Sequence, residues 1–223
     1  MDKTIYTKEY YVASLDLLGA KNLICNDDKD KTLNSIKNIY YSWLNIKHAV
    51  YSNCINIKIF SDNIIVAAEC DIQGSLDEIL VFISYMAEHF LKCGYKVRGG
   101  ITKGNLYIDN IFVWGKALVD AYVLESKIAC YPRIIIDKSL ISIISDHIRD
   151  ILIDQCEDGY FMLNYLKSFG SNAEKHLDII NNAIKNLINE NVKDESIQRK
   201  NDWLMNFLSQ NKAYWDNYEK KEE

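Results

Sequence analysis

The stretch Ile55–Glu69, INIKIFSDNIIVAAE, constrains the fold more than any other part of the chain. Two apolar runs with the composition of β-strands flank the triplet Ser-Asp-Asn, whose residue types favour tight turns. The stretch therefore predicts a β-hairpin with the carboxylate of Asp62 at its tip. Because side chains alternate between the two faces of a strand, Lys58 and Phe60 should lie on the same face as Asp62.

A second acid lies in similar surroundings. The segment Tyr10–Ala20, YYVASLDLLGA, predicts a buried strand that carries Asp16 near its end. Two buried carboxylates repel each other and are costly to desolvate, so acids at the ends of adjacent core strands usually need a cation between them. We interpret Asp16 and Asp62 as a pair that binds a divalent metal. The alternative is that each acid only caps a turn.

Helical spacing of apolar residues predicts several helices. They cover residues 32–50, 71–94, 116–130, 139–150 and two segments after Asn172. In the second of these helices, Ser75 and Glu78 have the spacing of an N-terminal capping box, and Gly94 should end the helix. Tyr122 and Glu125, in the third, are expected to have packing and surface roles.

A strand is predicted at 95–107, with Arg98-Gly99-Gly100 near its centre. Glycines inside a strand indicate close approach by a ligand or another backbone, or a simple bulge. Shorter strands are predicted after Pro132 and at 159–166.

The predicted order of the first elements is β-α-β-β-α-β, the arrangement of a ferredoxin-like α+β fold, with additional C-terminal helices. We expect a first domain at residues 1–170 and a helical extension at 171–223. The apolar side chains of the extension suit packing on the domain or on a second subunit. They are Trp203, Leu204, Phe207, Leu208 and Trp215.

Composition excludes several function classes. The chain has 223 residues, a net charge of -5 and a pI near 5.5, without the basic stripe of a protein that binds a phosphate backbone, so nucleic acid is not expected as a partner. No apolar run of the signal-peptide type or of membrane-spanning length is present, which predicts a soluble cytoplasmic protein without membrane contact. The 6 cysteines form no CxxC pair, so reduced thiols are expected and a zinc site is not.

Three segments, in this order, resemble the class III nucleotidyl cyclase catalytic domain, and more closely the Pycsar pyrimidine cyclases of antiphage defence. They are VASLDLLGAK, IKIFSDNIIVAA and VRGGITKGNLYIDNIFVWGKALVDAYVLES, and the resemblance covers residues 8–140. It implies that Asp16 and Asp62 bind two divalent cations, Mg²⁺ or Mn²⁺. It also implies that backbone groups of Leu17, Leu18 and Gly19 contact a metal or the nucleotide phosphates, with Leu17 as the metal ligand.

The implied reaction is attack of the 3'-hydroxyl of a nucleoside triphosphate on its α-phosphorus, with pyrophosphate leaving. In the purine cyclases a lysine at the position of Lys58 contacts the base. The other base-contacting position holds Phe112, and the positions that orient the ribose and stabilise the transition state hold Val119 and Val123. These replacements fit the pyrimidine branch, which implies conversion of UTP to cyclic UMP. The alternatives are a cytidylate cyclase that uses CTP and a non-catalytic nucleotide-sensing dimerisation module.

Charge stabilisation would then come from other cationic groups. Arg98 and Arg133 are the candidates for contact with the phosphates, beside Lys103 and Lys116. Each could instead be an ordinary solvated charge. Phe60 could stack on the base or belong to the core.

The resemblance also implies the partners. Class III sites form between two subunits, so we expect a homodimer with two equivalent sites. The product would be a second messenger sensed by a separate effector.

Overall fold

The computed structural model describes residues 6–20, 34, 37, 40–41, 54–167 and 172–222. The helix predicted at 32–50 lies outside these residues apart from the isolated positions 34, 37 and 40–41. All statements below concern the described part of the chain.

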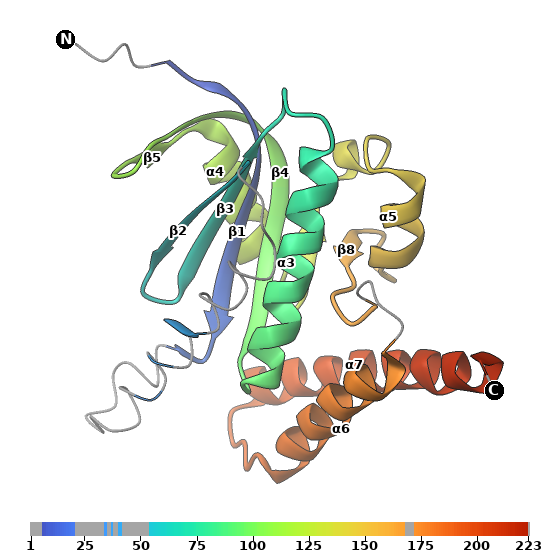
Figure 1. Cartoon of the computed structure of the whole chain (residues 1–223). Coiled ribbons are helices and arrows are strands. Elements are labelled where there is room, and N and C mark those ends of the chain that lie inside the picture. Colours follow the sequence, from blue (N-terminus) through green and yellow to red (C-terminus); the bar gives the residue numbers. More distant parts are fainter. Residues whose placement is uncertain are drawn as a thin grey trace.

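The centre of the fold is strand β1, Lys8–Leu18, which pairs antiparallel with strands on both sides. On one side lies β3, Asn63–Glu69, whose outer neighbour is β2, Ile55–Phe60; on the other side lies β4, Lys96–Ile108. The resulting order β2-β3-β1-β4 is that of a ferredoxin-like sheet (Figure 1). The predicted hairpin and the predicted α+β fold are confirmed.

Beyond β4 the sheet continues with short strands. Strand β6, Ile134–Ile136, pairs in parallel with β4, and β8, Phe161–Leu163, pairs antiparallel with β6 and with β7, Ile153–Gln155. Strand β5, Val113–Trp114, pairs only with the end of β4. The strand predicted at 159–166 is therefore present but shorter than expected.

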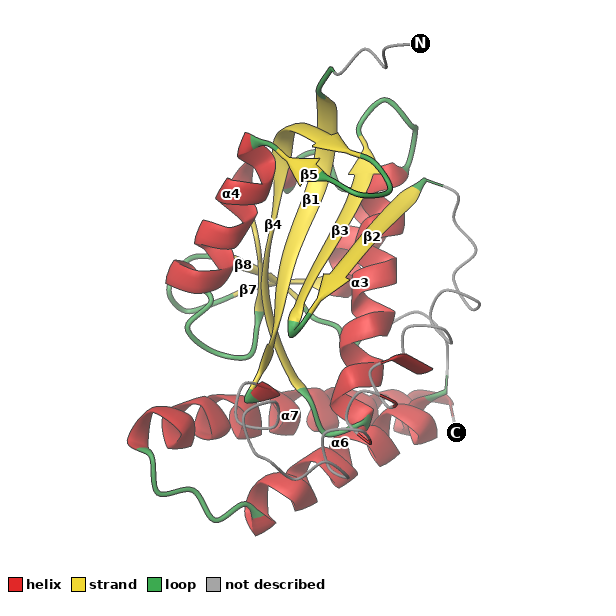
Figure 2. Cartoon of the chain, turned by 90° about the vertical axis from the view of Figure 1, so that its left-hand side faces the viewer, coloured by secondary structure: helices red, strands yellow, loops and turns green. Residues whose placement is uncertain are grey.

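Helices cover both faces of the sheet. They are α3 (Ser75–Lys92), α4 (Lys116–Val123) with a π-helical continuation (Leu124–Ile128), a 3-10 helix (Lys138–Leu140), α5 (Asp146–Leu152), α6 (Ala173–Asn189) and α7 (Glu195–Glu222). Figure 2 shows α3 and α4 on opposite faces of the sheet, with α6 and α7 at one end. None of the helices in the described ranges is both long enough and apolar enough to cross a membrane.

The start of α3 differs from the expectation. Gly74, with φ 80°, occupies the N-cap position, and Ser75 is already inside the helix. The Ser75 hydroxyl is buried and donates to the carbonyl oxygen of Glu69 at 2.7 Å. The predicted capping box was wrong because this hydroxyl bonds to the end of β3 instead of the helix's own amides. The predicted helix end at Gly94, with φ 85°, is confirmed.

The C-terminal helices complete the main core. Leu204, Phe207, Leu208 and Trp215 of α7 are buried in the cluster that also contains α3 and one face of the sheet. The Trp215 indole donates to the carbonyl oxygen of Leu166 at 2.8 Å. Of the two expected surroundings for these side chains, the structure has packing on the domain.

A smaller core lies on the other face of the sheet, under α4. It consists of Tyr10, Val12, Ile65, Ala67, Leu106, Ala117 and Ala121. Gly100 of β4 permits this packing: a Cβ at this position would lie 2.4 Å from both the Ala121 carbonyl oxygen and Leu124 Cβ. Of the alternatives left open for these glycines, the structure shows close approach of another backbone at Gly100.

Gly100→Ala should destabilise the fold, since the added methyl group must push α4 off the sheet. We expect a loss of about 1–3 kcal/mol in the free energy of unfolding, measured by urea denaturation. The matched control is Gly104→Ala on the same strand, where the nearest atom to the new Cβ is Ala117 Cβ at an ordinary 3.5 Å. Equal stability of the two variants would contradict the close contact.

One buried histidine joins the C-terminal helices to α3. The ring of His176, on α6, stacks on Trp215 with 4.4 Å between ring centroids, and its Nδ1 lies 3.5 Å from Glu88 Oε1 of α3. Burial lowers the pKa of His176, and this effect exceeds the opposing influence of the Glu88 charge. The folded protein therefore resists protonation of this ring.

We expect the free energy of unfolding to fall as the pH drops below about 6.5. In the unfolded chain His176 then binds a proton, whereas in the folded protein its lowered pKa keeps it neutral. The slope is at most about 1.4 kcal/mol per pH unit for one group. Burial also lowers the pKa of His89, which adds to the slope in the same direction. His176→Gln should reduce the slope in denaturation series from pH 5 to 8, whereas exposed His147→Gln serves as the control. An unchanged slope in His176→Gln would contradict this account.

Candidate functional site

Strand register brings three of the sequence-predicted site residues, Phe60, Asp16 and Arg98, onto one row across the sheet. Phe60 pairs with Asn63, Asn63 with Asp16, and Asp16 with Arg98. Lys58 lies two pairs further along and is opposite Ile65, a member of the small core under α4. Directly paired residues share a face, so Lys58, Phe60, Asp16 and Arg98 all lie on the α4 side of the sheet. The shared face predicted for Lys58 and Phe60 is confirmed, whereas Asp62, predicted on the same face, lies in the turn outside the paired strands.

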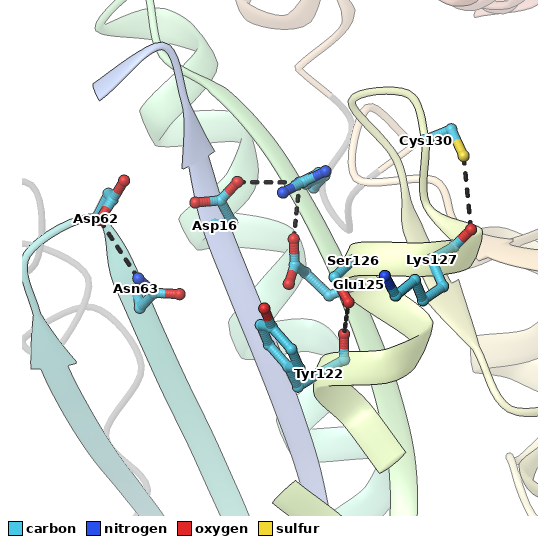
Figure 3. Close-up of polar contacts among 9 residues, drawn as sticks. Asp16, Asp62, Asn63, Tyr122, Glu125, Ser126, Lys127 and Cys130 are labelled. Atoms are coloured by element: carbon cyan, nitrogen blue, oxygen red, sulfur yellow. Dashed lines mark hydrogen bonds and ion pairs between the residues drawn. The ribbon is translucent and has the colours of Figure 1, made fainter. Parts of the chain in front are cut away.

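Backbone hydrogen bonding holds the two acids on adjacent segments. The Leu17 amide donates to the Asp62 carbonyl oxygen at 3.0 Å, which ties the end of β1 to the hairpin turn. The turn is tight, with Ser61 at φ 55°, and the Asn63 amide group donates to Asp62 Oδ1 at 3.3 Å. Figure 3 shows Asp62 at the turn beside Asp16 on the neighbouring strand. The predicted proximity of Asp16 and Asp62 is therefore present in the fold.

The cation beside Asp16 is an arginine. Arg98 Nε donates to Asp16 Oδ2 at 2.9 Å and lies 2.7 Å from Glu125 Oε1, and both contacts are drawn in Figure 3. Because Arg98 stands directly opposite Asp16 in the β1–β4 register, the contact follows from the strand pairing. The sequence singled out both residues without indicating that they meet.

Glu125 was missed as a site residue. Packing and surface roles were expected for Tyr122 and Glu125, but the Glu125 side chain is only 2% exposed and lies against Arg98. Burial raises the pKa of Glu125; the Arg98 charge lowers it and the Asp16 charge raises it. A signal was available in the sequence, since Glu125 follows the small buried residues Ala117 and Ala121 at four-residue intervals along one helix face.

The segment after Asp16 can meet a ligand mainly through its backbone. The Leu17 side chain is buried in the main core, and its amide is already bonded to Asp62. Leu18 is partly buried, and Gly19 adopts φ 86° just before a helical residue at Ala20. This arrangement leaves carbonyl oxygens, rather than the Leu17 side chain or amide, as the groups that could bind a cation.

Arg133 pairs with an acid other than Asp16 or Asp62. Its guanidinium is buried at the start of β6, where it donates to Asp158 at 2.6 Å and to the Ile128 carbonyl oxygen at 3.1 Å. The hydrogen bond from Arg133 holds the pKa of Asp158 below its ordinary value. The other two candidate cations pair locally, Lys103 with Glu9 and Lys116 with Asp120. Among the described residues, Arg98 is the one of the four cationic candidates that pairs with Asp16.

The donor set fits a hard cation. Asp16, Asp62 and nearby carbonyl groups supply oxygen atoms only, which suits Mg²⁺ or Mn²⁺. Within residues 6–20, 54–167 and 172–222, no group of three or more His, Cys, Asp or Glu side chains could hold a metal by itself. Two cavities of about 350 and 360 Å³ lie elsewhere, between α3 and α6 and beside the β7–β8 hairpin. In the described part of the chain, the face of the sheet around the acids is partly open to solvent, since Phe60 is 60% exposed and the Asp16 side chain 16%.

An exposed apolar surface adjoins this face. We call it the α4–β5 surface; its members are Ile111, Phe112, Trp114, Val119, Tyr122 and Val123, each at least 45% exposed. The turn before β5 is built by Asp109, whose Oδ1 accepts from the amides of Ile111 and Phe112. Phe112 and Trp114 stack with 6.0 Å between ring centroids. Such a group of exposed large apolar side chains is typical of an interaction site.

No family model and no curated protein matches the sequence. Solved structures do match. The guanylyl cyclase Cya2 has a TM-score of 0.54 at 13% identity, over 72% of this chain and 93% of that one. The adenylyl cyclase CyaB from P. aeruginosa has a TM-score of 0.54 at 16% identity, over 72% of this chain and 96% of that one. A class III adenylyl cyclase-like ATP-binding protein from Pseudomonas aeruginosa has a TM-score of 0.51 at 11% identity, over 72% of this chain and 39% of that one.

These similarities concern the fold. The chain has the α+β fold of the class III cyclase catalytic domains, with additional C-terminal helices. At identities of this size the chemistry of the site has to be argued from its own residues.

Proposed function

We propose that this protein is a nucleotide cyclase that converts UTP to cyclic UMP and pyrophosphate. The observation that carries the proposal is the row of Phe60, Asp16 and Arg98 across the open face of a class III cyclase-like sheet, with Asp62 bonded to the end of the same strand. Paired acids beside an arginine suit a triphosphate held through divalent cations.

In this proposal the residues have separate roles. Asp16, Asp62 and the Leu17 carbonyl group hold two divalent cations, Mg²⁺ or Mn²⁺. When bound, these ions lower the pKa of the 3'-hydroxyl and neutralise charge on the phosphates. Backbone groups at Leu18 and Gly19 lie next to the acids and contact the phosphates. The 3'-hydroxyl gives its proton to solvent, and its oxygen forms a bond to the α-phosphorus as the bond from that phosphorus to the pyrophosphate oxygen breaks.

Arg98 would supply positive charge near the transferring phosphate. Its guanidinium adjoins Asp16 and is partly exposed, so it can reach a ligand on the open face. Arg133 was a second candidate, but its buried pairing with Asp158 supports a structural role in this proposal.

Lys58 and Phe60 are the candidates for contact with the base. Phe60 is 60% exposed, so its ring is available for stacking. The choice of a pyrimidine rests on the sequence resemblance and on the apolar Val119 and Val123, which are also exposed on α4. CTP is the alternative substrate. The product would act as a second messenger in antiphage defence, through a separate effector.

A homodimer belongs to the proposal. The α4–β5 surface gives a second copy an apolar area to cover beside the open site. A subunit docked there would bring its own α4 residues next to the acids of its partner.

A non-catalytic nucleotide-sensing module is the second candidate. It is favoured by the ion pair between Arg98 and Asp16, which already neutralises one of the two acids, and by the valines at positions 119 and 123. Binding of nucleotide without turnover, measured by calorimetry, would support this candidate.

With Mn²⁺ and each of ATP, GTP, CTP and UTP in turn, we expect the purified protein to form cyclic UMP from UTP, identified by mass spectrometry. Asp16→Asn and Asp62→Asn should each lower the rate at least about 100-fold, because each removes a charged ligand of the cations. The matched control is Asp150→Asn on the exposed side of α5, which should keep the wild-type rate.

Other outcomes of this assay separate the alternatives. Cyclic CMP as the main product would assign CTP as the substrate. Bound nucleotide without any cyclic product would support the sensing module. Full activity in Asp62→Asn would overturn the assigned metal site.

Val119→Glu combined with Val123→Glu should abolish dimers, because two charges would be buried at the centre of the contact. Mass measurement by light scattering checks the oligomeric state. Ile188→Glu, at a similarly exposed apolar position on α6, is the control and should leave the dimer intact. A dimer that survives the α4 double variant would assign the contact to another surface.

A further inference from the structure

Arg98 lies between two carboxylates that differ in their exposure to solvent. The side chain of Asp16, near the end of β1, is 16% exposed, whereas that of Glu125 is 2% exposed. The Arg98 Nε atom is 2.9 Å from the first and 2.7 Å from the second. The Arg98 Nε atom therefore lies within hydrogen-bonding distance of both carboxylates.

The Nε atom carries one hydrogen, and it donates this hydrogen in a hydrogen bond to Asp16 Oδ2. Among the residues that the structure describes, no donor meets Glu125 Oε1 in hydrogen-bond geometry, although Nε is so close. A buried carboxylate oxygen without a hydrogen bond is costly. The arrangement leaves Glu125 as an acceptor that a small rotation of the guanidinium would satisfy.

Glu125 is fixed in place by the packing of its helix. Its backbone nitrogen would lie 2.8 Å from a Cβ at Gly100, which is two residues from Arg98 on the same face of β4. Glu125 also belongs to the π-helical segment, a distortion frequent at functional sites. The Arg98 guanidinium is 23% exposed against 2% for Glu125, so of these two side chains the guanidinium is the one that can rotate.

We propose that Glu125 is a positioning residue for Arg98, which bonds to Asp16 in the cation-free protein and turns its N–H to Glu125 when Asp16 becomes a cation ligand. The inference rests on the proposed function in one respect, the assignment of Asp16 as a ligand. Arg98 then serves as the counter-charge of Asp16 at rest. With the cation bound, Glu125 keeps the guanidinium beside the site instead of releasing it to solvent.

This role has a specific thermodynamic consequence. Arg98 competes with the cation for Asp16, so its removal should tighten cation binding. Glu125 offers Arg98 another partner and so favours its release from Asp16, which means that loss of the Glu125 charge should weaken cation binding. The effect of Glu125 should require the presence of Arg98, and a double-mutant cycle measures such dependence.

The test uses Mn²⁺ alone, added to the full chain without nucleotide, with free Mn²⁺ quantified by electron paramagnetic resonance. We expect Arg98→Met to tighten binding by roughly tenfold and Glu125→Gln to weaken it by a similar factor. In the double variant, the Glu125→Gln substitution should have no further effect relative to Arg98→Met alone. Asp16→Asn is the control for binding at the site and should lose it.

Each other outcome counts against the inference in a recognisable way. Equal weakening by Glu125→Gln with and without Arg98 would mean that Glu125 acts directly through its charge, which overturns the inference and leaves the proposed function standing. If Glu125→Gln does not fold, the Arg98→Met variant provides the test. Tighter Mn²⁺ binding supports the competition between Arg98 and the cation for Asp16, and unchanged Mn²⁺ binding overturns it. If neither the wild type nor any variant binds Mn²⁺, both the inference and the proposed metal site are overturned. The wild-type protein should then also lack cyclase activity.

Discussion

The register of β1 against both of its neighbours is the constraint on which the site depends. It puts Asn63, Asp16 and Arg98 opposite one another on three adjacent strands. A shift of one residue would turn Asp16 into the main core and Leu15 or Leu17 onto the open face. The apolar side chains of β1 that belong to the main core, Tyr11, Ala13, Leu15 and Leu17, make such a shift costly, so the hydrophobic pattern itself fixes the position of the acid.

The two faces of the sheet are covered to different extents. One face supplies most of the hydrophobic core, and the other carries the candidate site residues. One face is packed by α3 and the C-terminal helices, which together form the large core. Among the described residues, the other face is covered by α4 (Figure 2) and its π-helical continuation, with a small core beneath α4. The row of Phe60, Asp16 and Arg98 lies on this same face. Glycine at position 100 is the sequence feature that allows α4 to lie close enough to bring Glu125 to Arg98.

Much of this arrangement could be predicted from local sequence. The hairpin around Asp62, the strand with Asp16 and the glycine contact in β4 each follow from short patterns, because strand alternation and turn preferences act within a few residues. Ser75 was misassigned because its hydroxyl bonds to Glu69 rather than to its own helix. The burial of Glu125 and the pairing of Arg133 were missed for another reason: their partners, Arg98 and Asp158, are distant in sequence and meet only through the tertiary fold. The metal and substrate roles remain predictions.

The place of α7 in the main core has a consequence for synthesis of the chain. The strands are complete by residue 163, but Trp215, which covers the same core, is made about 50 residues later, a delay of several seconds at usual rates of translation. During that interval the apolar side chains that α7 covers in the folded protein remain open to water. A ribosome that pauses between these two points would therefore present an incompletely covered core, the kind of surface to which chaperones bind.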